Sequence, residues 1–213
     1  RIVAEGTVPA TRRALAAWAD GLTRPWRGAM EATLFTGWIY DFLRPRADEL
    51  KVGHSFMLRA ICAAKKKNDR VDARKLADAL RCNLLPECYM APAEIRDLRR
   101  VLRYRNLLVR EAVRLKNKTA GLLMEVGAEY DKNRVDGQKY FDELLGRLDE
   151  IPESVVDLLR LNRSSQKVFE ASQKRLVRGL KEHPALAERV QRLMSIPAVG
   201  EITALTWALE VAD

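Results

Sequence analysis

A long stretch without proline limits the possible folds of this chain more than any other feature of its sequence. Residues 94–126 contain no proline, and an apolar or small residue recurs there at alternating steps of four and three, at Leu108, Ala112, Leu115, Thr119, Leu122 and Val126. This heptad spacing is typical of a long helix that packs along a second helix. Residues 153–181 form a second tract of helical periodicity. The sequence therefore predicts an antiparallel helical hairpin within one chain or a coiled coil between two chains.

The first 90 residues have a different pattern, in which short strands alternate with helices. Residues 2–8 alternate like a strand, and a second short strand is expected at residues 26–30. Thr11 is a suitable N-cap for a helix at 12–19, and helical spacing returns at 33–43 and at 72–81. Such alternation predicts a sheet flanked by helices, which is an α/β domain.

Changes in composition divide the chain into three expected regions. Pro86 and Pro92 bracket a connector, and residues 195–200 form a turn between two helical stretches. We expect an α/β domain at 1–90, an all-α coiled-coil and dimerisation domain at 91–185, and the start of a further helical module at 186–213. The chain begins within a strand-like run and stops just after an apolar segment, so we expect it to be a fragment.

The charge balance favours a polyanionic partner. The chain carries 38 Lys and Arg against 29 Asp and Glu, for a formal charge of +9. Such an excess is typical of proteins that bind nucleic acid. No segment is long and apolar enough to cross a bilayer, and no signal peptide is recognisable, so we expect a soluble intracellular protein.

The predicted long helix carries most of this positive charge. Between residues 99 and 118 there are eight Lys and Arg and a single acid, Glu111. A helix with this imbalance would repel itself unless a polyanion lies along it, and phosphate contacts from it would be independent of base sequence. The alternative is a bundle helix whose cations pair with acids on another tract.

Three carboxylates are candidates for chemistry. Glu31 is expected at the C-terminal end of a strand, the edge where open α/β sheets build their sites. Asp69 and Asp72 lie three residues apart at the start of a helix, where paired acids could hold Mg²⁺ through oxygen ligands. The alternative for these two is ordinary helix capping, with acids that complement the helix dipole.

One sequence motif resembles a known family. Residues 65–77 resemble the K-x-D-x-x-D-A signature of the DEDD transposases of bacterial insertion sequences, which are related to the Piv site-specific invertases; Lys67, Asp69, Asp72 and Ala73 occupy its fixed positions. Similar segments occur in the family's order at 29–33, 84–86, 102–105 and 196–200, so the resemblance covers nearly the whole chain.

This resemblance implies an RNase H or RuvC-like fold for residues 1–90, without its first strand, and four acids that bind a divalent metal, Mg²⁺ or Mn²⁺. Glu31 would be the E of the four, and Asp69 and Asp72 the last two acids. The first Asp is expected upstream of Arg1.

The resemblance also implies a nucleophilic serine beyond Asp213, which would not be Ser195, so the fragment alone is expected to be inactive. Residues 196–200 resemble a helix-hairpin-helix turn, although Ala198 replaces a common glycine. Family membership would further imply two nucleic-acid partners, DNA and a structured noncoding guide RNA. We expect the contacts to nucleic acid to come from Lys65, Lys66, Lys67, Arg70, Arg99, Arg103, Arg110, Arg114 and Lys118.

The leading hypothesis is a DNA transposase of the bacterial cytoplasm. It would catalyse metal-dependent strand cleavage and exchange for an insertion sequence, as a homodimer or higher oligomer. Two alternatives stay open: a RuvC-like junction nuclease that cuts with water, and a dimeric nucleic-acid-binding module without chemistry.

Overall fold

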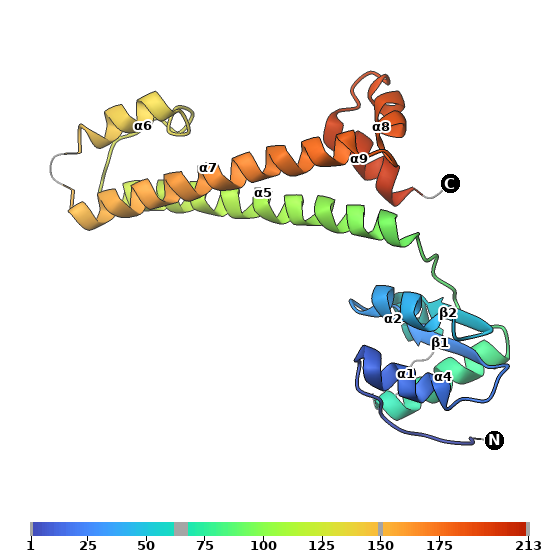
Figure 1. Ribbon diagram of the computed structural model, residues 1–213. Coiled ribbons are helices and arrows are strands. Elements are labelled where there is room, and N and C mark those ends of the chain that lie inside the picture. The colour runs from blue at the N-terminus through green and yellow to red at the C-terminus, as the bar shows by residue number, and fades with distance from the viewer. Residues whose placement is uncertain (1, 62–67, 149–150, 212–213) are drawn as a thin grey trace. The chain divides into compact units, whose positions relative to one another are not determined.

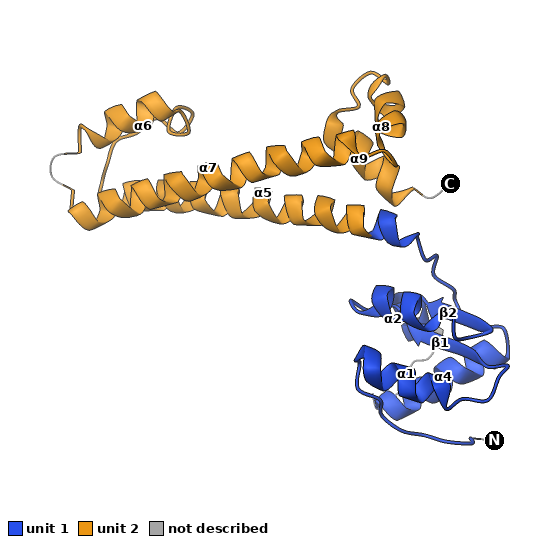
Figure 2. Cartoon of the chain, in the orientation of Figure 1, with its two compact units in different colours: residues 1–96 blue, residues 97–213 orange. Residues whose placement is uncertain are grey.

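The computed structural model describes residues 2–61, 68–148 and 151–211. The chain forms two compact units, residues 1–96 and 97–213, shown in two colours in Figure 2. The boundary falls in the first turn of a long helix, four residues beyond the connector around Pro92. The finer division into three regions, at 1–90, 91–185 and 186–213, stays a prediction.

The N-terminal unit contains a two-stranded parallel sheet and helices. Its elements, labelled in Figure 1, are α1 (Arg12–Asp20), β1 (Arg27–Glu31), α2 (Thr36–Leu43), β2 (Glu49–Gly53), α3 (Ser55–Ile61) and α4 (Asp69–Arg81). In the sheet, Arg27 is opposite Glu49 and Glu31 is opposite Gly53. Because the strands are parallel, both end at the same edge.

The core of this unit follows from side-chain alternation along β2. Leu50 and Val52 are buried, while Lys51 between them pairs with Glu49 at 3.5 Å and with Glu87 at 3.1 Å. The carboxylate of Glu87, followed by that of Glu49, raises the pKa of the Lys51 ammonium group. Leu50 joins the buried residues Leu15, Ala19, Leu43 and Ala47 in one cluster, so α1 and α2 are held against the sheet.

Two strand predictions differ from the structure. Residues 2–8 form no strand, because alternation alone supplies no neighbouring strand to complete the backbone hydrogen bonds. Strand β2 at Glu49–Gly53 is not among the strands that the sequence predicts. Within the described residues the sheet has two strands. The α/β character is confirmed, and the RNase H-like assignment stays a prediction.

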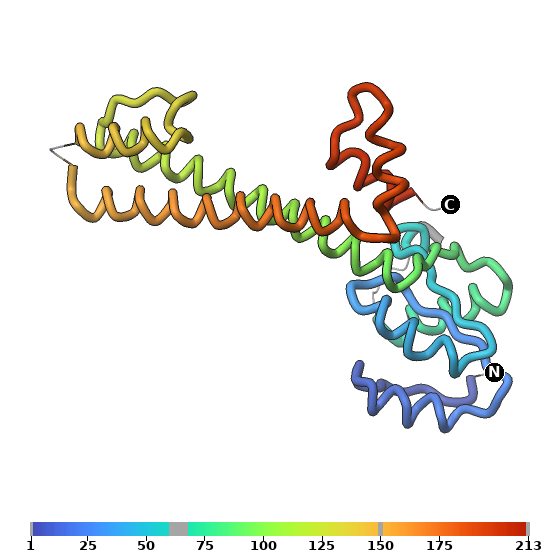
Figure 3. Tube along the Cα trace, turned by 45° about the horizontal axis from the view of Figure 1, so that its top comes forward, coloured from blue at the N-terminus to red at the C-terminus, as the bar shows by residue number. Residues whose placement is uncertain are grey.

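The C-terminal unit is entirely helical in its described part. It contains α5 (Ala93–Glu125) from Asp97 onward, α6 (Gln138–Leu145), α7 (Glu153–Glu182), α8 (Ala187–Met194) and α9 (Glu201–Glu210). The two longest helices, α5 and α7, run in opposite directions beside each other, as Figures 1 and 3 show. At 1.5 Å per residue, the 33 residues of α5 extend for about 50 Å.

Contacts along the two long helices define an antiparallel hairpin. Near the end of α5, Leu122 and Leu123 share a buried cluster with Leu159 of α7. Farther along, Nζ of Lys116 lies 3.8 Å from Oε1 of Glu170. The hairpin alternative from the sequence is therefore observed, and α7 covers the heptad seam of α5 within one chain.

The buried face of α7 follows heptad spacing. Leu158 is exposed and Leu159 is fully buried. Leu159, Gln166 and Leu180 are separated by 7 and 14 residues, which are multiples of the heptad, and all three are buried. The side chain of Gln166 donates a hydrogen bond to Glu170 at 2.9 Å, which satisfies a polar group inside the seam.

Helices α8 and α9 pack against each other and against the end of α7. Val190, Leu205 and Leu209 are buried there. Between α8 and α9, Ala198 adopts a left-handed conformation with φ of 67°. This is the position at which the resemblance leads one to expect a glycine, so an alanine occupies a backbone conformation that favours glycine.

Candidate nucleic-acid and metal-binding site

Glu31 lies at the C-terminal edge of the sheet, as the sequence predicts. The amide of Ala32, the next residue, donates to the carbonyl oxygen of Gly53 at 2.9 Å, which extends the pairing of β1 with β2 by one bond. The Glu31 side chain is exposed. It makes no ion pair with another described residue, so its negative charge is available to a ligand.

The turn after Glu31 is fixed by two threonines. The buried hydroxyl of Thr36 donates to the carbonyl oxygen of Glu31 at 3.1 Å and accepts from the amide of Thr33 at 2.6 Å. The amide of Phe35 donates to the hydroxyl of Thr33 at 3.3 Å. These bonds hold the backbone between β1 and α2, and with it the position of Glu31.

Asp69 and Asp72 occupy the first turn of α4. The N-cap is Asn68, whose side chain accepts a hydrogen bond from the amide of Arg70 at 2.9 Å. Neither aspartate is therefore the N-cap that the capping alternative proposed, although both stand where the helix dipole favours negative charge. Asp69 is exposed and Asp72 is half-buried. Helix α4 packs against β1, the strand that ends in Glu31.

The donor chemistry of these acids suits a divalent cation, but their arrangement does not form a complete site. Carboxylate oxygens are the ligands that Mg²⁺ and Mn²⁺ prefer. Among the described residues, however, no group of three or more Asp, Glu, His or Cys side chains is close enough to hold a metal. The structure therefore does not bring Glu31, Asp69 and Asp72 together as one three-ligand group.

Arg70, one of the expected nucleic-acid contacts, pairs with an acid from the extended N-terminal segment. The carboxylate of Glu5 accepts from Arg70 and from Arg74, with 2.5 Å between Arg74 Nε and Glu5 Oε1. The hydrogen bond from Arg74, and to a smaller extent the one from Arg70, lowers the pKa of Glu5 to about 2. Arg74 is not among the contacts expected from the sequence, although its position four residues after Arg70 places it on the same helical face.

The basic residues of α5 fall into two groups. Arg99 is largely buried: its Nε donates to the carbonyl oxygen of Leu209 at 2.6 Å and lies 3.5 Å from Glu210, which ties α5 to α9. Arg103 reaches Glu210 at 3.2 Å and Arg114 reaches Glu111 at 3.1 Å, but both stay exposed. Arg99 is thus a structural contact, whereas the side chains of Arg103 and Arg114 stay at the surface.

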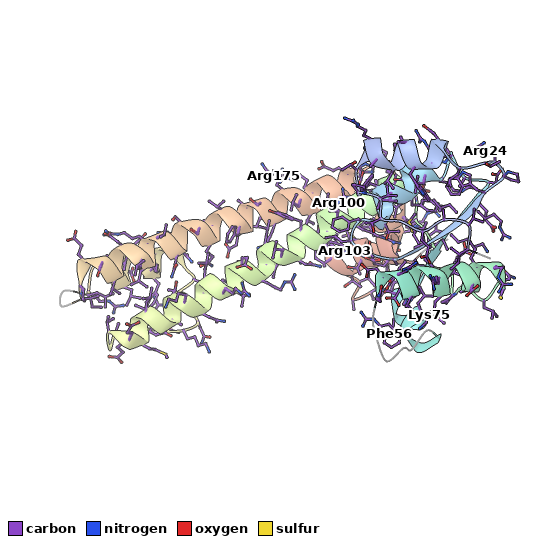
Figure 4. The ribbon with its side chains drawn as sticks, turned by 90° about the horizontal axis from the view of Figure 1, so that it is seen from below. Arg24, Phe56, Lys75, Arg100, Arg103 and Arg175 are labelled. Atoms are coloured by element: carbon purple, nitrogen blue, oxygen red, sulfur yellow. The ribbon has the colours of Figure 1, made fainter. Side chains whose placement is uncertain are left out.

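Two further cations on α5 have no partner among the described residues. Arg110 and Lys118 are exposed and are eight residues apart, on similar faces of the helix. Figure 4 shows side chains along the length of α5 and labels Arg100 and Arg103 near its start. We call Arg103, Arg110, Arg114 and Lys118 the α5 basic stripe. The expected contacts Lys65, Lys66 and Lys67 lie outside the described residues.

A cavity of about 640 Å³ opens beside the long helices, between residues of α5, α7 and α9. Its lining includes four cations, Arg105, Lys174, Arg178 and Lys181, and the acids Glu170, Glu182 and Glu201. Nε of Arg105 is buried there without a hydrogen-bond partner. This cavity could not be predicted from the sequence, because its lining comes from three helices that are distant along the chain.

Comparison with known proteins agrees with the motifs. Residues 1–127 match a family of DEDD transposases of the IS110 type, described as a transposase. The match covers more than half of the chain, including Glu31, Asp69, Asp72 and the α5 basic stripe. None of the curated proteins shows a significant match.

The chain belongs to the IS110-type DEDD transposases. This membership supports a role in DNA transposition, in an enzyme class that binds, cleaves and recombines DNA and that normally uses a divalent metal. No described helix has both the length and the apolar character to span a membrane.

Proposed function

We propose that this chain belongs to a transposase that cleaves and exchanges DNA strands for an insertion sequence, with Glu31, Asp69 and Asp72 as the acids of its metal site. The single observation that carries the proposal is the family match over residues 1–127, which contains all three acids in the family's order.

In this proposal the acids of the metal site come from two places, the end of β1 and the start of α4. Glu31 is held at the sheet edge by the Ala32 to Gly53 hydrogen bond and by Thr36. Asp69 and Asp72 stand at the start of a helix that packs against the same strand. A bound Mg²⁺ or Mn²⁺ would activate the attacking oxygen and stabilise the charge that develops on the phosphate. The chain's own part is to keep the three carboxylates free of ion pairs with other described residues, with Glu31 and Asp69 exposed and Asp72 half-buried.

The α5 basic stripe would bind the phosphate backbone of the substrate. Arg103, Arg110, Arg114 and Lys118 are exposed along one long helix, so they can follow successive phosphates without reading bases. An RNA backbone offers the same phosphates, which agrees with a structured guide RNA as a second partner. Assembly as a homodimer or higher oligomer is part of the same proposal.

The experiment that tests this function is a search for a covalent protein–DNA adduct. A protein that contains this chain is incubated with DNA carrying the ends of its element, with and without Mg²⁺, and analysed on a denaturing gel. Metal-dependent adduct formation is the expected result. Cleavage to free ends without an adduct would favour the junction nuclease instead, and binding without any cleavage would favour the non-catalytic module.

A further inference from the structure

Four large apolar side chains are exposed on two segments of the N-terminal unit. Leu34 is 93% exposed and Phe35 is 58% exposed, in the turn after β1. Phe56 is 74% exposed and Met57 is 51% exposed, at the start of α3, and Phe56 is labelled in Figure 4. Soluble proteins rarely expose several large apolar side chains together unless the surface binds something.

These two segments leave the sheet at one edge. Strands β1 and β2 are parallel and Glu31 is opposite Gly53, so the turn 32–35 and the segment 54–57 both begin where the strands end. The hydrogen bond from Ala32 to the carbonyl of Gly53 joins their starting points. The edge that carries the exposed carboxylate of Glu31 therefore also carries the four apolar side chains, which we call the apolar rim.

The backbone on both sides of this edge is firmly held. Thr33 and Thr36 fix the turn that presents Leu34 and Phe35. On the other segment, Leu58 is buried directly against the end of β2: a Cβ atom at Gly53 would lie only 2.8 Å from Leu58 Cδ1. The rim side chains are thus exposed by an ordered backbone, which reduces the entropy cost of binding a ligand there.

We propose that the apolar rim binds unstacked bases of the DNA strand that approaches Glu31. This inference rests on the proposed function and adds the group that positions the strand. Aromatic side chains stack on exposed bases, and Phe, Leu and Met are the residue types that separate neighbouring bases.

A single ligand can contact both the apolar rim and the carboxylate of Glu31. A DNA strand can place a base against the apolar rim and the adjoining phosphate near Glu31. A protein seated on the rim would instead cover the side of the sheet from which a phosphodiester must reach the carboxylate. The position of the rim therefore favours nucleic acid over a protein partner.

The test compares single-stranded with duplex DNA on the 213-residue chain. Phe35→Ala with Phe56→Ala should weaken binding of a 2-aminopurine-labelled single strand by about 5- to 150-fold per stacked base that is lost, and should abolish the quenching of the probe. Binding of a fully paired duplex, and the salt dependence of binding, should not change. A variant that carries Phe35→Trp in place of Phe35→Ala, together with Phe56→Ala, should regain quenching of the probe. Met124→Ala, which removes an exposed apolar side chain from α5, should have no effect on binding or quenching.

Three results would overturn the inference. The first is wild-type affinity for single-stranded DNA in the double variant. The second is an equal loss on duplex. The third is a loss confined to an RNA strand of the same sequence. A wild-type dimer that becomes a monomer in the variant would instead make the rim a protein interface. If the double variant melts early, Leu34→Ser changes the most exposed rim residue without touching an aromatic ring, and retention of full affinity in it would also count against the rim.

Failure of the rim can be separated from failure of the proposed function. If the adduct forms but the rim variants bind single strands normally, the function stands and the rim is wrong. If no adduct forms while the rim variants lose single-strand binding, the rim stands and the function is wrong.

Discussion

Glu31, Asp69 and Asp72 have no ion-pair partner among the described residues; Glu31 and Asp69 are exposed and Asp72 is half-buried. Most acids of the N-terminal unit are engaged: Glu49 pairs with Arg27, and a hydrogen bond from that arginine lowers the pKa of Glu49. Asp41 pairs with Arg96, and Glu5 binds two arginines. The three family acids thus stand apart from the acids that stabilise the fold, and a cation is the partner that they lack.

Two glycines near the end of α5 give a matched test of the backbone. Gly127 has φ of 68°, and the amides of Gly127 and Ala128 donate to the carbonyls of Met124 and Leu123, which closes the helix with a Schellman motif. Gly121 is within the helix, and no atom lies within 4 Å of the place that a Cβ atom would take there. Gly127→Ala should lower the free energy of unfolding by about 1 kcal/mol, because alanine is strained at positive φ.

Gly121→Ala is the control and should raise the free energy of unfolding by about 0.8 to 1 kcal/mol, since alanine favours a helix interior. Urea unfolding of the two variants measures both effects. Opposite signs are expected, and equal signs would mean that α5 does not end at this turn.

At the scale of secondary structure, the helices could be predicted more fully than the sheet. The seam of α5 and the cap at Thr11 are local patterns, and the structure has a helix at Ala93–Glu125 and a bond from the Ala14 amide to the Thr11 hydroxyl. Strand β2 has visible alternation, but it is only five residues long and only two of these, Leu50 and Val52, are apolar. Its identity depends on pairing with β1, which no local pattern reports.

The candidate site shows the same limit. Placement of Glu31 at a strand end follows from local sequence, but its relation to Gly53 and the segment after β2 follows from the sheet register. Arg99 illustrates the converse: its position on a basic helix suggested a phosphate contact, whereas packing of α9 assigns it to the carbonyl of Leu209. Sequence reasoning identified the residue types, and tertiary contacts divided them into structural and available groups.

The α5 basic stripe can be tested by its salt dependence. Replacing Arg103, Arg110 and Arg114 by Ala should weaken binding of any DNA duplex and flatten the slope of log K against log salt by about one unit per lost phosphate contact. Arg160→Ala is the matched control, because Arg160 is an exposed arginine on α7 with a helical acid partner like that of Arg114. Fluorescence anisotropy at several salt concentrations measures the slope, and an unchanged slope in the triple variant would exclude the stripe.

The contact between the N-terminal segment and α4 should persist to low pH. A depressed carboxyl pKa means that its stabilising contribution is complete above the ordinary value of 4.5 and is lost as the pH falls toward about 2. Carboxyl NMR of the chain should therefore show Glu5 titrating near 2. Arg74→Ala removes the hydrogen bond that lowers the pKa of Glu5 most, so this pKa should return toward 4.5 in the variant. An unchanged pKa of Glu5 in the variant would contradict the assigned contact.

For the whole molecule, the two units carry different parts of the proposed activity. The N-terminal unit holds the three acids and the apolar rim, and the C-terminal unit holds the whole α5 basic stripe. Each unit has its own buried cluster, one around Leu15 and Leu50 and the other around Leu123 and Leu159. Substitutions in one unit should therefore leave the stability of the other nearly unchanged.

Self-association stays a prediction, and the surface that would mediate it lies on α7 and not on the seam of α5. The seam of α5 is covered within the chain, but Leu158, Leu161 and Val168 form an exposed stripe on α7 at steps of three and seven. That spacing suits packing against another helix. Sedimentation at tens of micromolar should show a dimer or larger species, and Leu161→Glu with Val168→Glu should convert it to a monomer. A monomeric wild type would show that the stripe has no such partner.

The proposed strand cleavage depends most directly on the three acids Glu31, Asp69 and Asp72. Strand cleavage of element-end DNA in the presence of Mg²⁺ should be measured for a protein that contains this chain and for its Glu31→Gln, Asp69→Asn and Asp72→Asn variants. Asp78→Asn serves as the control, because Asp78 is an acid of the same helix α4 that pairs with Arg81. We expect each of the three variants to lose cleavage while DNA binding is retained, and the control to cleave like the wild type. Cleavage at the wild-type rate in any of the three would contradict the assignment of that acid.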